Sequence, residues 1–156
     1  MGLKKERILI LSSGKLVPKE LKPLQDQYLE RLGNFNIKTF EIGLYQDQLS
    51  EEKNLNLKIN ELAKSYQNLR VFLLRENGQH YSSHQFAHWL NKGLTNNERF
   101  LFVISSQRGF TQEFIELYPN HFSLSLLTFP HKIVSTILVE QIYRAETIIE
   151  NRPYHY

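Results

Sequence analysis

The sequence predicts an α/β fold with a mainly parallel sheet and helices on both faces. Five apolar runs alternate with longer amphipathic stretches along the 156 residues, which is typical of strands that alternate with helices. Most of the runs are continuously apolar, as expected for strands that are buried on both faces. The length fits one domain over residues 1–156, whose core needs neither a disulfide nor a metal.

The first half of the chain predicts two strands and two helices. Residues 7–12 read Arg-Ile-Leu-Ile-Leu-Ser and predict the first strand. A loop that includes Pro18 leads into a helix over residues 19–32, which has apolar residues along one face. Residues 37–42 alternate in polarity and predict the second strand. Residues 50–66 predict a helix with acidic residues in its first turn.

The second half predicts three strands and three helices. We first expect a strand over residues 71–74, a turn at Glu76-Asn77-Gly78 and a helix from Ser82 or Ser83. A strand over 100–104 is followed by a helix that Thr111 caps and that ends before Pro119. The last two elements are a strand over 122–127 and a helix over 131–149. Parallel sheets bind ligands beyond the carboxyl ends of their strands. We therefore expect a site at the turns after Leu74, Ile104 and Leu127.

The composition excludes several classes of protein. The chain has no cysteine, which excludes disulfides, thiolate zinc sites and cysteine nucleophiles. No apolar run approaches the roughly 20 residues of a membrane span, and the first residues lack the core of a signal peptide. The sequence therefore predicts a soluble, cytoplasmic protein.

The net charge of +3 is unevenly distributed. Residues 1–23 carry six lysines and arginines and two carboxylates, a local charge of +4, whereas the remaining residues carry 13 basic and 14 acidic side chains. A basic segment suits a polyanion such as a nucleic acid. A charge of this size is also typical of a solvated surface, so both interpretations stay open.

Generic motifs add little to this prediction. A glycine-rich dinucleotide loop, a phosphate loop and a serine-nucleophile elbow are all missing from the sequence. His80, His84 and His88 are spaced by four, but no third metal ligand is near, so a solvated helix face is favoured over a metal site. Arg144 and Glu140 have the spacing of an ordinary helical ion pair.

Three segments in the last third of the chain carry a specific resemblance. They read LSLLTFPH at residues 124–131, LVEQIYRA at residues 138–145 and PYHY at residues 153–156. In this order they resemble the ribosomal RNA large subunit methyltransferase H family of the SPOUT superfamily. The resemblance covers essentially the whole chain, including Gly14-Lys15 and Ser82-Ser83.

This resemblance implies a SPOUT-type fold with a C-terminal trefoil knot, a homodimer and the cofactor S-adenosyl-L-methionine. It implies methylation of N3 of a pseudouridine in large-subunit (23S) ribosomal RNA, with that RNA or the assembled ribosome as partner and with no metal or membrane. By position, Tyr154 and His155 would contact the target base and Arg144 would orient it or support the structure. The implied cofactor contacts are Leu74, Ser105, Gly109, Leu124, Ser125, Leu126, Leu127, Thr128 and Phe129.

The sequence departs from the family pattern near this implied site. The pattern Gly-Gly-x-x-Gly is replaced by Ser-Ser-Gln-Arg-Gly at residues 105–109. The family usually has an arginine at the position of Ser135 and an acidic residue at that of Arg75. Two hypotheses follow: a divergent, active methyltransferase, or a catalytically impaired SPOUT-fold dimer that acts as an RNA-binding or scaffold protein.

The departures lead to two specific expectations. Glycines permit a close approach of the backbone to a ligand, so Ser105 and Ser106 are expected to narrow the cofactor pocket. Replacing both serines by glycine would then strengthen cofactor binding. Ser135→Arg would mainly affect RNA turnover, because a guanidinium orients phosphate groups or bases.

Overall fold

The computed structural model describes residues 6–156 and contains one five-stranded parallel sheet. Its strand order is β2-β1-β4-β3-β5, and the predicted α/β class with a parallel sheet is confirmed. The elements are β1 (Ile8–Ser13), α1 (Lys22–Arg31), β2 (Ile37–Ile42), α2 (Gln48–Ser65), β3 (Leu69–Gln79), α3 (Ser83–Thr95), β4 (Arg99–Ile104), α4 (Gln112–Leu117), β5 (His121–Phe122) and α5 (His131–Ile149).

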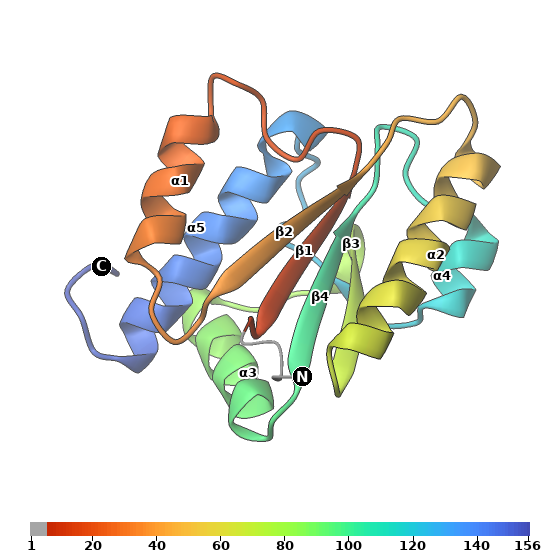
Figure 1. The fold of residues 1–156 in the computed structure, drawn as a ribbon. Coiled ribbons are helices and arrows are strands. Elements are labelled where there is room, and N and C mark those ends of the chain that lie inside the picture. The colour runs from red at the N-terminus through yellow and green to blue at the C-terminus, as the bar shows by residue number, and fades with distance from the viewer. Residues whose placement is uncertain (1–5) are drawn as a thin grey trace.

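Helices cover both faces of the sheet. Figure 1 shows α1, α3 and α5 on one face and α2 and α4 on the other. Successive side chains of a strand point to opposite faces, so Ile8 and Ile10 belong to the core cluster beneath α5, and Leu9 and Leu11 to the cluster beneath α2. β1 and β4 are therefore buried from both sides, as their continuous apolar runs predicted, whereas the edge strand β2 is only partly covered.

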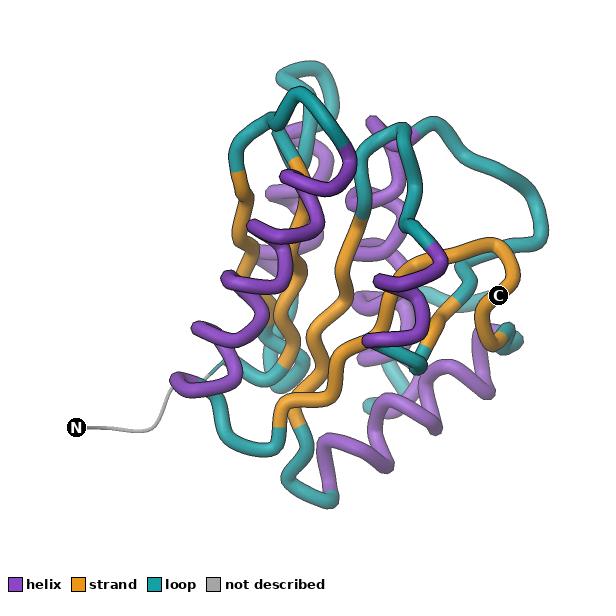
Figure 2. Tube along the Cα trace, turned by 90° about the vertical axis from the view of Figure 1, so that its right-hand side faces the viewer, coloured by secondary structure: helices purple, strands orange, loops and turns teal. Residues whose placement is uncertain are grey.

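The third strand is longer than predicted, because the expected turn at residues 76–78 belongs to it. Figure 2 shows the last part of β3 curving away from the rest of the sheet. A Cβ atom added to Gly78 would lie 2.7 Å from the backbone of Phe122. The missing side chain therefore lets β3 and β5 approach each other, and the glycine that suggested a turn serves a strand contact instead.

The fifth strand is shorter than predicted and contains only His121 and Phe122. The expected strand over residues 122–127 is wrong beyond Phe122, because serine hydroxyls take over the local hydrogen bonds. Ser123 Oγ donates to the carbonyl oxygen of Ser125 at 2.8 Å, and the N–H of Leu127 donates to Ser125 Oγ at 3.0 Å. Such local bonds compete with a strand ladder and favour a bent loop.

Most helix boundaries follow recognisable caps. The third helix starts at the predicted serines, where Ser82 and Gln85 form a capping box, and Thr111 caps α4 as the sequence predicted. The start of α2 lies at Gln48 rather than at residue 50, because Asp47 accepts the N–H of Ser50 at 2.7 Å. The first helix begins at Lys22 rather than at residue 19, with a proline in its first turn.

Candidate functional site

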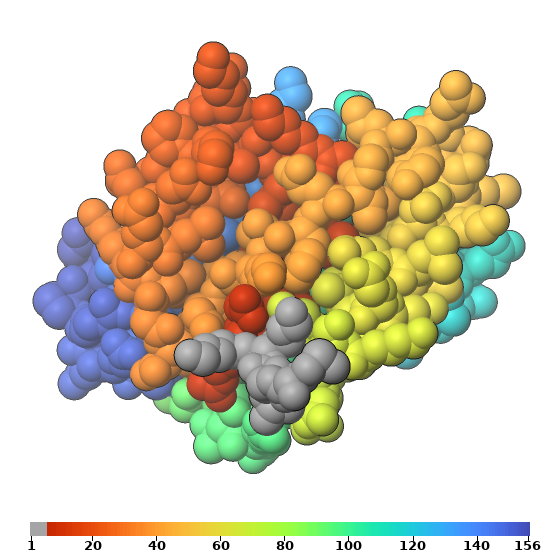
Figure 3. Space-filling model, viewed as in Figure 1, coloured from red at the N-terminus to blue at the C-terminus, as the bar shows by residue number. Residues whose placement is uncertain are grey.

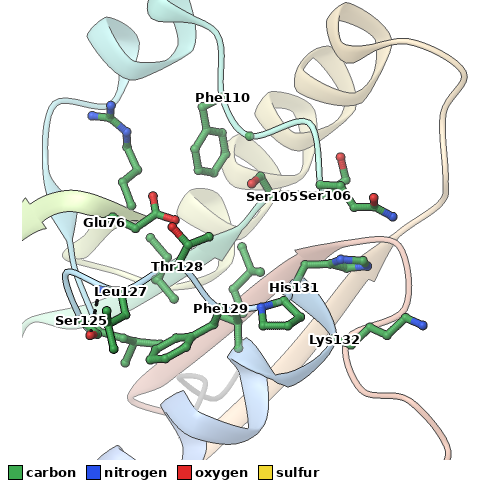
Figure 4. A pocket seen from close by; sticks show the side chains of 18 of the residues that line it. Glu76, Ser105, Ser106, Phe110, Ser125, Leu127, Thr128, Phe129, His131 and Lys132 are labelled. Atoms are coloured by element: carbon green, nitrogen blue, oxygen red, sulfur yellow. Dashed lines mark hydrogen bonds between the residues drawn. The ribbon is translucent and has the colours of Figure 1, made fainter.

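A pocket of about 760 Å³ opens at the carboxyl ends of β3 and β4. Its walls come from the end of β3, from the loop after β4, and from the segment between β5 and α5 (Figure 4). This is the edge of a parallel sheet at which ligands bind. The volume suits a small molecule of cofactor size.

Almost all residues assigned to the cofactor by the family resemblance line this pocket. The exception is Leu126, which does not line it and is 75% exposed. The segments that supply these residues are far apart in the sequence, so the fold brings them together. The lining members are Leu74, Ser105, Gly109, Leu124, Ser125, Leu127, Thr128 and Phe129.

Sequence reasoning missed several lining residues because they lie outside the matched motifs or where a turn was expected. Glu76 is on the part of β3 that was taken as a turn, and Phe110 follows the loop after β4. His131 and Val134 belong to the first turn of α5. These residues could have been found from their positions, because they lie close to the strand and helix ends at which the site was expected.

The loop between β5 and α5 leaves much of its backbone without internal partners. Within residues 6–156, its own hydrogen bonds run through Ser123, Ser125 and Leu127, and no bond is made by the backbone N–H of Leu124 or Thr128. Backbone groups in such a loop are strong donors and acceptors that need partners. The donor set of this wall therefore fits a polar ligand such as an adenosine-containing cofactor.

The loop after β4 accommodates its two serines without strain. In this loop only Gly109 has a positive φ, +71°, whereas Ser105 and Ser106 do not. Glycine is therefore required at the last position and not at the first two. Both serines line the pocket, which keeps its volume of about 760 Å³.

Arg108 holds this loop from outside the pocket. Its guanidinium donates to the carbonyl oxygens of Tyr45 and Gln46 at 2.8 and 2.9 Å, and it pairs with the buried carboxylate of Glu51 at 3.4 Å. The residue does not line the pocket. Its charge fastens the segment before α2 to the loop and thereby fixes one wall of the pocket.

The pocket contains one carboxylate, that of Glu76. Figure 4 shows its side chain pointing toward Thr128. The adjacent Arg75 is bound instead to His121, with Nη1 3.1 Å from the imidazole Nδ1, and His121 Nε2 lies 2.9 Å from the carbonyl oxygen of Tyr118. Arginine only donates, so His121 accepts at Nδ1 and carries its proton on Nε2. Glu76 is thus left to accept hydrogen bonds from a ligand.

Ser135 does not belong to the pocket, which corrects the expectation for this position. Its side chain is buried, and Oγ donates to the carbonyl oxygen of Leu16 at 2.6 Å and lies 3.1 Å from Gln25 Oε1. The hydroxyl joins α5 to α1 and to the loop before it. An RNA contact through this side chain is therefore excluded by its burial.

The three residues expected to act on the target base are brought together, but away from the pocket. Arg144 pairs with Glu140 at 2.6 Å and lies 3.0 Å from His155 Nδ1 through Nη1. The hydroxyl of Tyr154 donates to Glu140 Oε1 at 2.9 Å. None of the three residues lines the pocket. We call Glu140, Arg144, Tyr154 and His155 the tail network.

The pocket and the tail network use different faces of α5. His131 contributes to the pocket, and Glu140 follows it by nine residues. At 3.6 residues per turn, two positions with this spacing point in opposite directions. A single chain therefore presents its tail and its pocket on separate sides of the same helix.

The tail network offers hydrogen-bond donors rather than a base. Burial raises the pKa of Tyr154 far above its ordinary value of 10.0, and hydrogen bonds with Tyr28 and Glu140 raise it further. Burial lowers the pKa of Arg144, but its bond to Glu140 outweighs this effect, so the guanidinium stays charged. Because Nδ1 of His155 faces this permanent donor, its proton lies on Nε2.

The described residues hold neither a metal cluster nor a membrane helix. In residues 6–156 no group of three potential metal ligands is found, and His84 instead packs its ring against that of His155, with centroids 5.0 Å apart. Over the same residues, every helix is too short or too polar to cross a bilayer.

Comparison with known proteins identifies similar chains over almost the full length. Residues 7–155 match the family model described as "Predicted SPOUT methyltransferase". Ribosomal RNA large subunit methyltransferase H of Christiangramia forsetii is 37% identical over 154 residues, which cover 96% of this chain and 98% of that protein. The protein of the same name from Mycoplasmopsis synoviae is 37% identical, covering 95% and 98%. Ribosomal RNA large subunit methyltransferase H 1 of Clostridium perfringens is 33% identical, covering 95% and 98%.

Proposed function

Because the chain belongs to the SPOUT methyltransferase family, we propose that it transfers a methyl group from S-adenosyl-L-methionine to N3 of a pseudouridine in 23S ribosomal RNA. The observation that carries this proposal is the open pocket of about 760 Å³, which is lined by the positions that the family assigns to its cofactor. A ribosomal substrate would place the reaction in the cytoplasm.

The residues of the pocket suit the proposed cofactor. When bound, S-adenosyl-L-methionine supplies an activated methyl group. The free backbone N–H groups of Leu124 and Thr128 would hold the polar edge of the adenosine, and Phe129 would cover its apolar surface. The carboxylate of Glu76 would accept a hydrogen bond from a ribose hydroxyl or from the ammonium group. Orientation of the methyl group toward N3 then supplies much of the acceleration.

The tail network would act on the pseudouridine. The N3 atom of the pseudouridine must lose its proton, which would pass to solvent, and the resulting negative charge would spread onto the neighbouring carbonyl oxygens. The Nε2–H group of His155 and the charged guanidinium of Arg144 are donors that would stabilise this charge. Tyr154 stays protonated, so we assign it to positioning and not to proton abstraction.

A homodimer would unite the two halves of this site. In one chain the pocket and the tail network face different sides of α5, so a partner's tail is needed to bring the donors to the methyl group. We also propose the family's trefoil knot for residues 122–149. This is supported by the path of the chain, which leaves β5 at one edge of the sheet and returns as α5 to pack against α1 and α3.

Cofactor titration and methyl transfer test the proposal together. The protein should bind S-adenosyl-L-methionine in isothermal titration, and it should methylate one pseudouridine of large ribosomal subunits from a strain that lacks its own enzyme. Thr128→Trp, which fills the pocket, should weaken cofactor binding more than 10-fold. Leu126→Trp is the matched control, because Leu126 is exposed and does not line the pocket. Absence of binding at millimolar cofactor would overturn the proposal.

A further inference from the structure

Three exposed lysines lie on two connected segments, namely the first turn of α5, which lines the pocket, and the loop between β1 and α1, which is bonded to α5. Lys132 lines the pocket, and Lys15 and Lys19 belong to the loop between β1 and α1. All three are exposed, and within residues 6–156 none forms an ion pair or a side-chain hydrogen bond. Other lysines near carboxylates are paired, such as Lys22 with Asp26 at 3.0 Å. We call Lys15, Lys19 and Lys132 the lysine rim.

A side-chain hydrogen bond of α5 connects the two segments that carry the lysine rim. Ser135 Oγ donates to the carbonyl oxygen of Leu16 at 2.6 Å, so the loop that contains Lys15 lies against the first turn of α5. Lys132 is one helical turn before Ser135. In Figure 4 the side chain of Lys132 points away from Thr128, toward the outside of the pocket. Figure 3 shows the loop before α1 projecting at the top of the molecule.

The carboxylates around the lysine rim are mostly occupied. Glu41 accepts the N–H of Leu16 at 2.6 Å, and Asp26 is paired with Lys22. Glu76 lies inside the pocket, and Glu20 is an exposed carboxylate on the loop itself. Outside the pocket the four lysines of this region, Lys22 included, outnumber its three carboxylates, so the local charge is positive by one.

We propose that the lysine rim binds phosphate groups of the RNA strand that delivers the target nucleotide to the pocket. This inference rests on the proposed function. Lysine contacts phosphate as a point charge and reads no sequence, so the rim would hold the strand while the pocket and the tail select the base. Lys4 and Lys5, which share the amino-terminal charge, lie outside the described residues.

Two double variants with the same net charge test this inference. Lys15→Gln with Lys19→Gln removes two rim lysines that do not line the pocket. Lys64→Gln with Lys92→Gln removes two exposed lysines near the carboxyl ends of α2 and α3. These lie near the amino ends of β3 and β4, opposite the pocket. Each double variant lowers the net charge of +3 by two. Bulk charge therefore cannot explain a difference between them.

The probes are a labelled single-stranded RNA and large ribosomal subunits, with binding followed by fluorescence anisotropy over a salt series. We expect the rim variant to bind roughly 20-fold more weakly at 0.1 M salt, and its logarithmic salt slope to fall by about 1.4, as expected for two lost phosphate contacts. The control should change less than twofold. Isothermal titration should give an unchanged cofactor Kd for both variants.

Three outcomes would overturn the inference. They are equal losses in the two double variants, failure of the parent protein to bind either RNA probe, and tighter binding of the rim to anionic phosphatidylserine vesicles than to RNA. If the parent methylates ribosomal subunits but the rim variant and the control variant bind RNA equally well, the inference fails and the proposed function stands. If the parent neither binds cofactor nor transfers methyl, the proposed function fails, whatever the RNA affinity.

Discussion

The pocket and the tail network lie on different faces of α5 and differ in how far their polar groups are satisfied. In the pocket, the backbone N–H groups of Leu124 and Thr128 and the carboxylate of Glu76 have no partner within the described chain. In the tail network, Glu140 alone binds both Arg144 and Tyr154. The pocket is therefore open to a ligand, whereas the side chains of the tail network already hold one another in place.

This difference separates two kinds of contribution to a reaction. Unsatisfied groups bind a ligand, because desolvating them without a partner is costly. Satisfied groups keep a donor in one orientation, which reduces the cost of reorganisation when charge develops. A substitution in the pocket should therefore change affinity, and one in the tail network should change turnover. Four predictions test this division, beginning with the α5 segment that joins the two regions.

The largest expected effect is at Ser135, between the pocket and the tail network. Ser135→Arg should destabilise the fold by about 3–5 kcal/mol, because it places an unpaired charge at a site that is 1% exposed. Ser135→Ala should cost only about 1–2 kcal/mol, since it loses the bond to Leu16. Urea unfolding monitored by circular dichroism measures both. A stable Ser135→Arg protein with altered RNA turnover would restore the role that family comparison suggested.

The next effect concerns Glu140, which orients the donors of the tail network. Glu140→Gln should lower the methyl-transfer kcat about 100-fold, because the negative charge that holds Arg144 is lost and Tyr154 keeps only a neutral amide oxygen as acceptor. Cofactor affinity should stay within twofold of the parent, because Glu140 does not line the pocket. Glu150→Gln is the matched control at the C-cap of α5, where the carboxylate bonds to Arg152 and Asn34, which are both exposed. Equal losses of affinity and turnover would contradict the division between the two regions.

Tyrosine ionisation gives a pH test of the tail network. The pKa of Tyr154 is raised in the folded protein, so its contribution to stability is fully present below pH 10.0 and is lost as the pH rises through the raised pKa. Burial also raises the pKa of Tyr66, Tyr81 and Tyr118. Absorbance at 295 nm should therefore show tyrosines that titrate late in the folded protein and normally after unfolding.

Tyr154→Phe should remove one of these late-titrating groups. Between pH 7 and 9 the shape of its rate profile should match that of the parent, because the phenol is protonated throughout this range. The turnover itself should fall by a few-fold through loss of the bond to Glu140. If the parent's rate rises with pH in this range and the rate of Tyr154→Phe does not, Tyr154 would instead be identified as a base.

The smallest effect is expected at the two serines of the pocket. Ser105→Gly with Ser106→Gly should change cofactor affinity by less than about threefold, because neither serine has a positive φ and the pocket is already open. This expectation replaces the one based on the family pattern, which favoured stronger binding. Isothermal titration decides between them: a gain of 10-fold or more would support the steric interpretation.

Local patterns predicted the sheet well because each buried strand carries its own apolar run. One error arose from a contact distant in the sequence, because Gly78 looks like a turn residue until β5 is placed beside it. The other arose from local hydrogen bonds, because those of Ser123 and Ser125 end a strand that the leucines at 124, 126 and 127 suggested.

The candidate site was predictable to a different extent in its two regions. Residues at strand ends were located because a parallel sheet places them at one edge. Glu76 was missed because its strand was predicted too short. The placement of Tyr154 against Glu140 was not predictable, since a chain end has no periodic pattern and docks only through its tertiary partners.

The shortness of β5 has a consequence for how the pocket opens. Only two residues, those of the edge strand β5, join the pocket wall at residues 123–130 to the sheet, whereas the central strand β4 is buried almost completely. Segments with few sheet hydrogen bonds open in local fluctuations that leave the rest of the protein folded. We therefore expect the amides around Phe122 to exchange their hydrogens faster than those of β4. A bound cofactor should slow this exchange. If this wall must open locally before the cofactor can leave, the rate of cofactor release should follow the rate of that local opening.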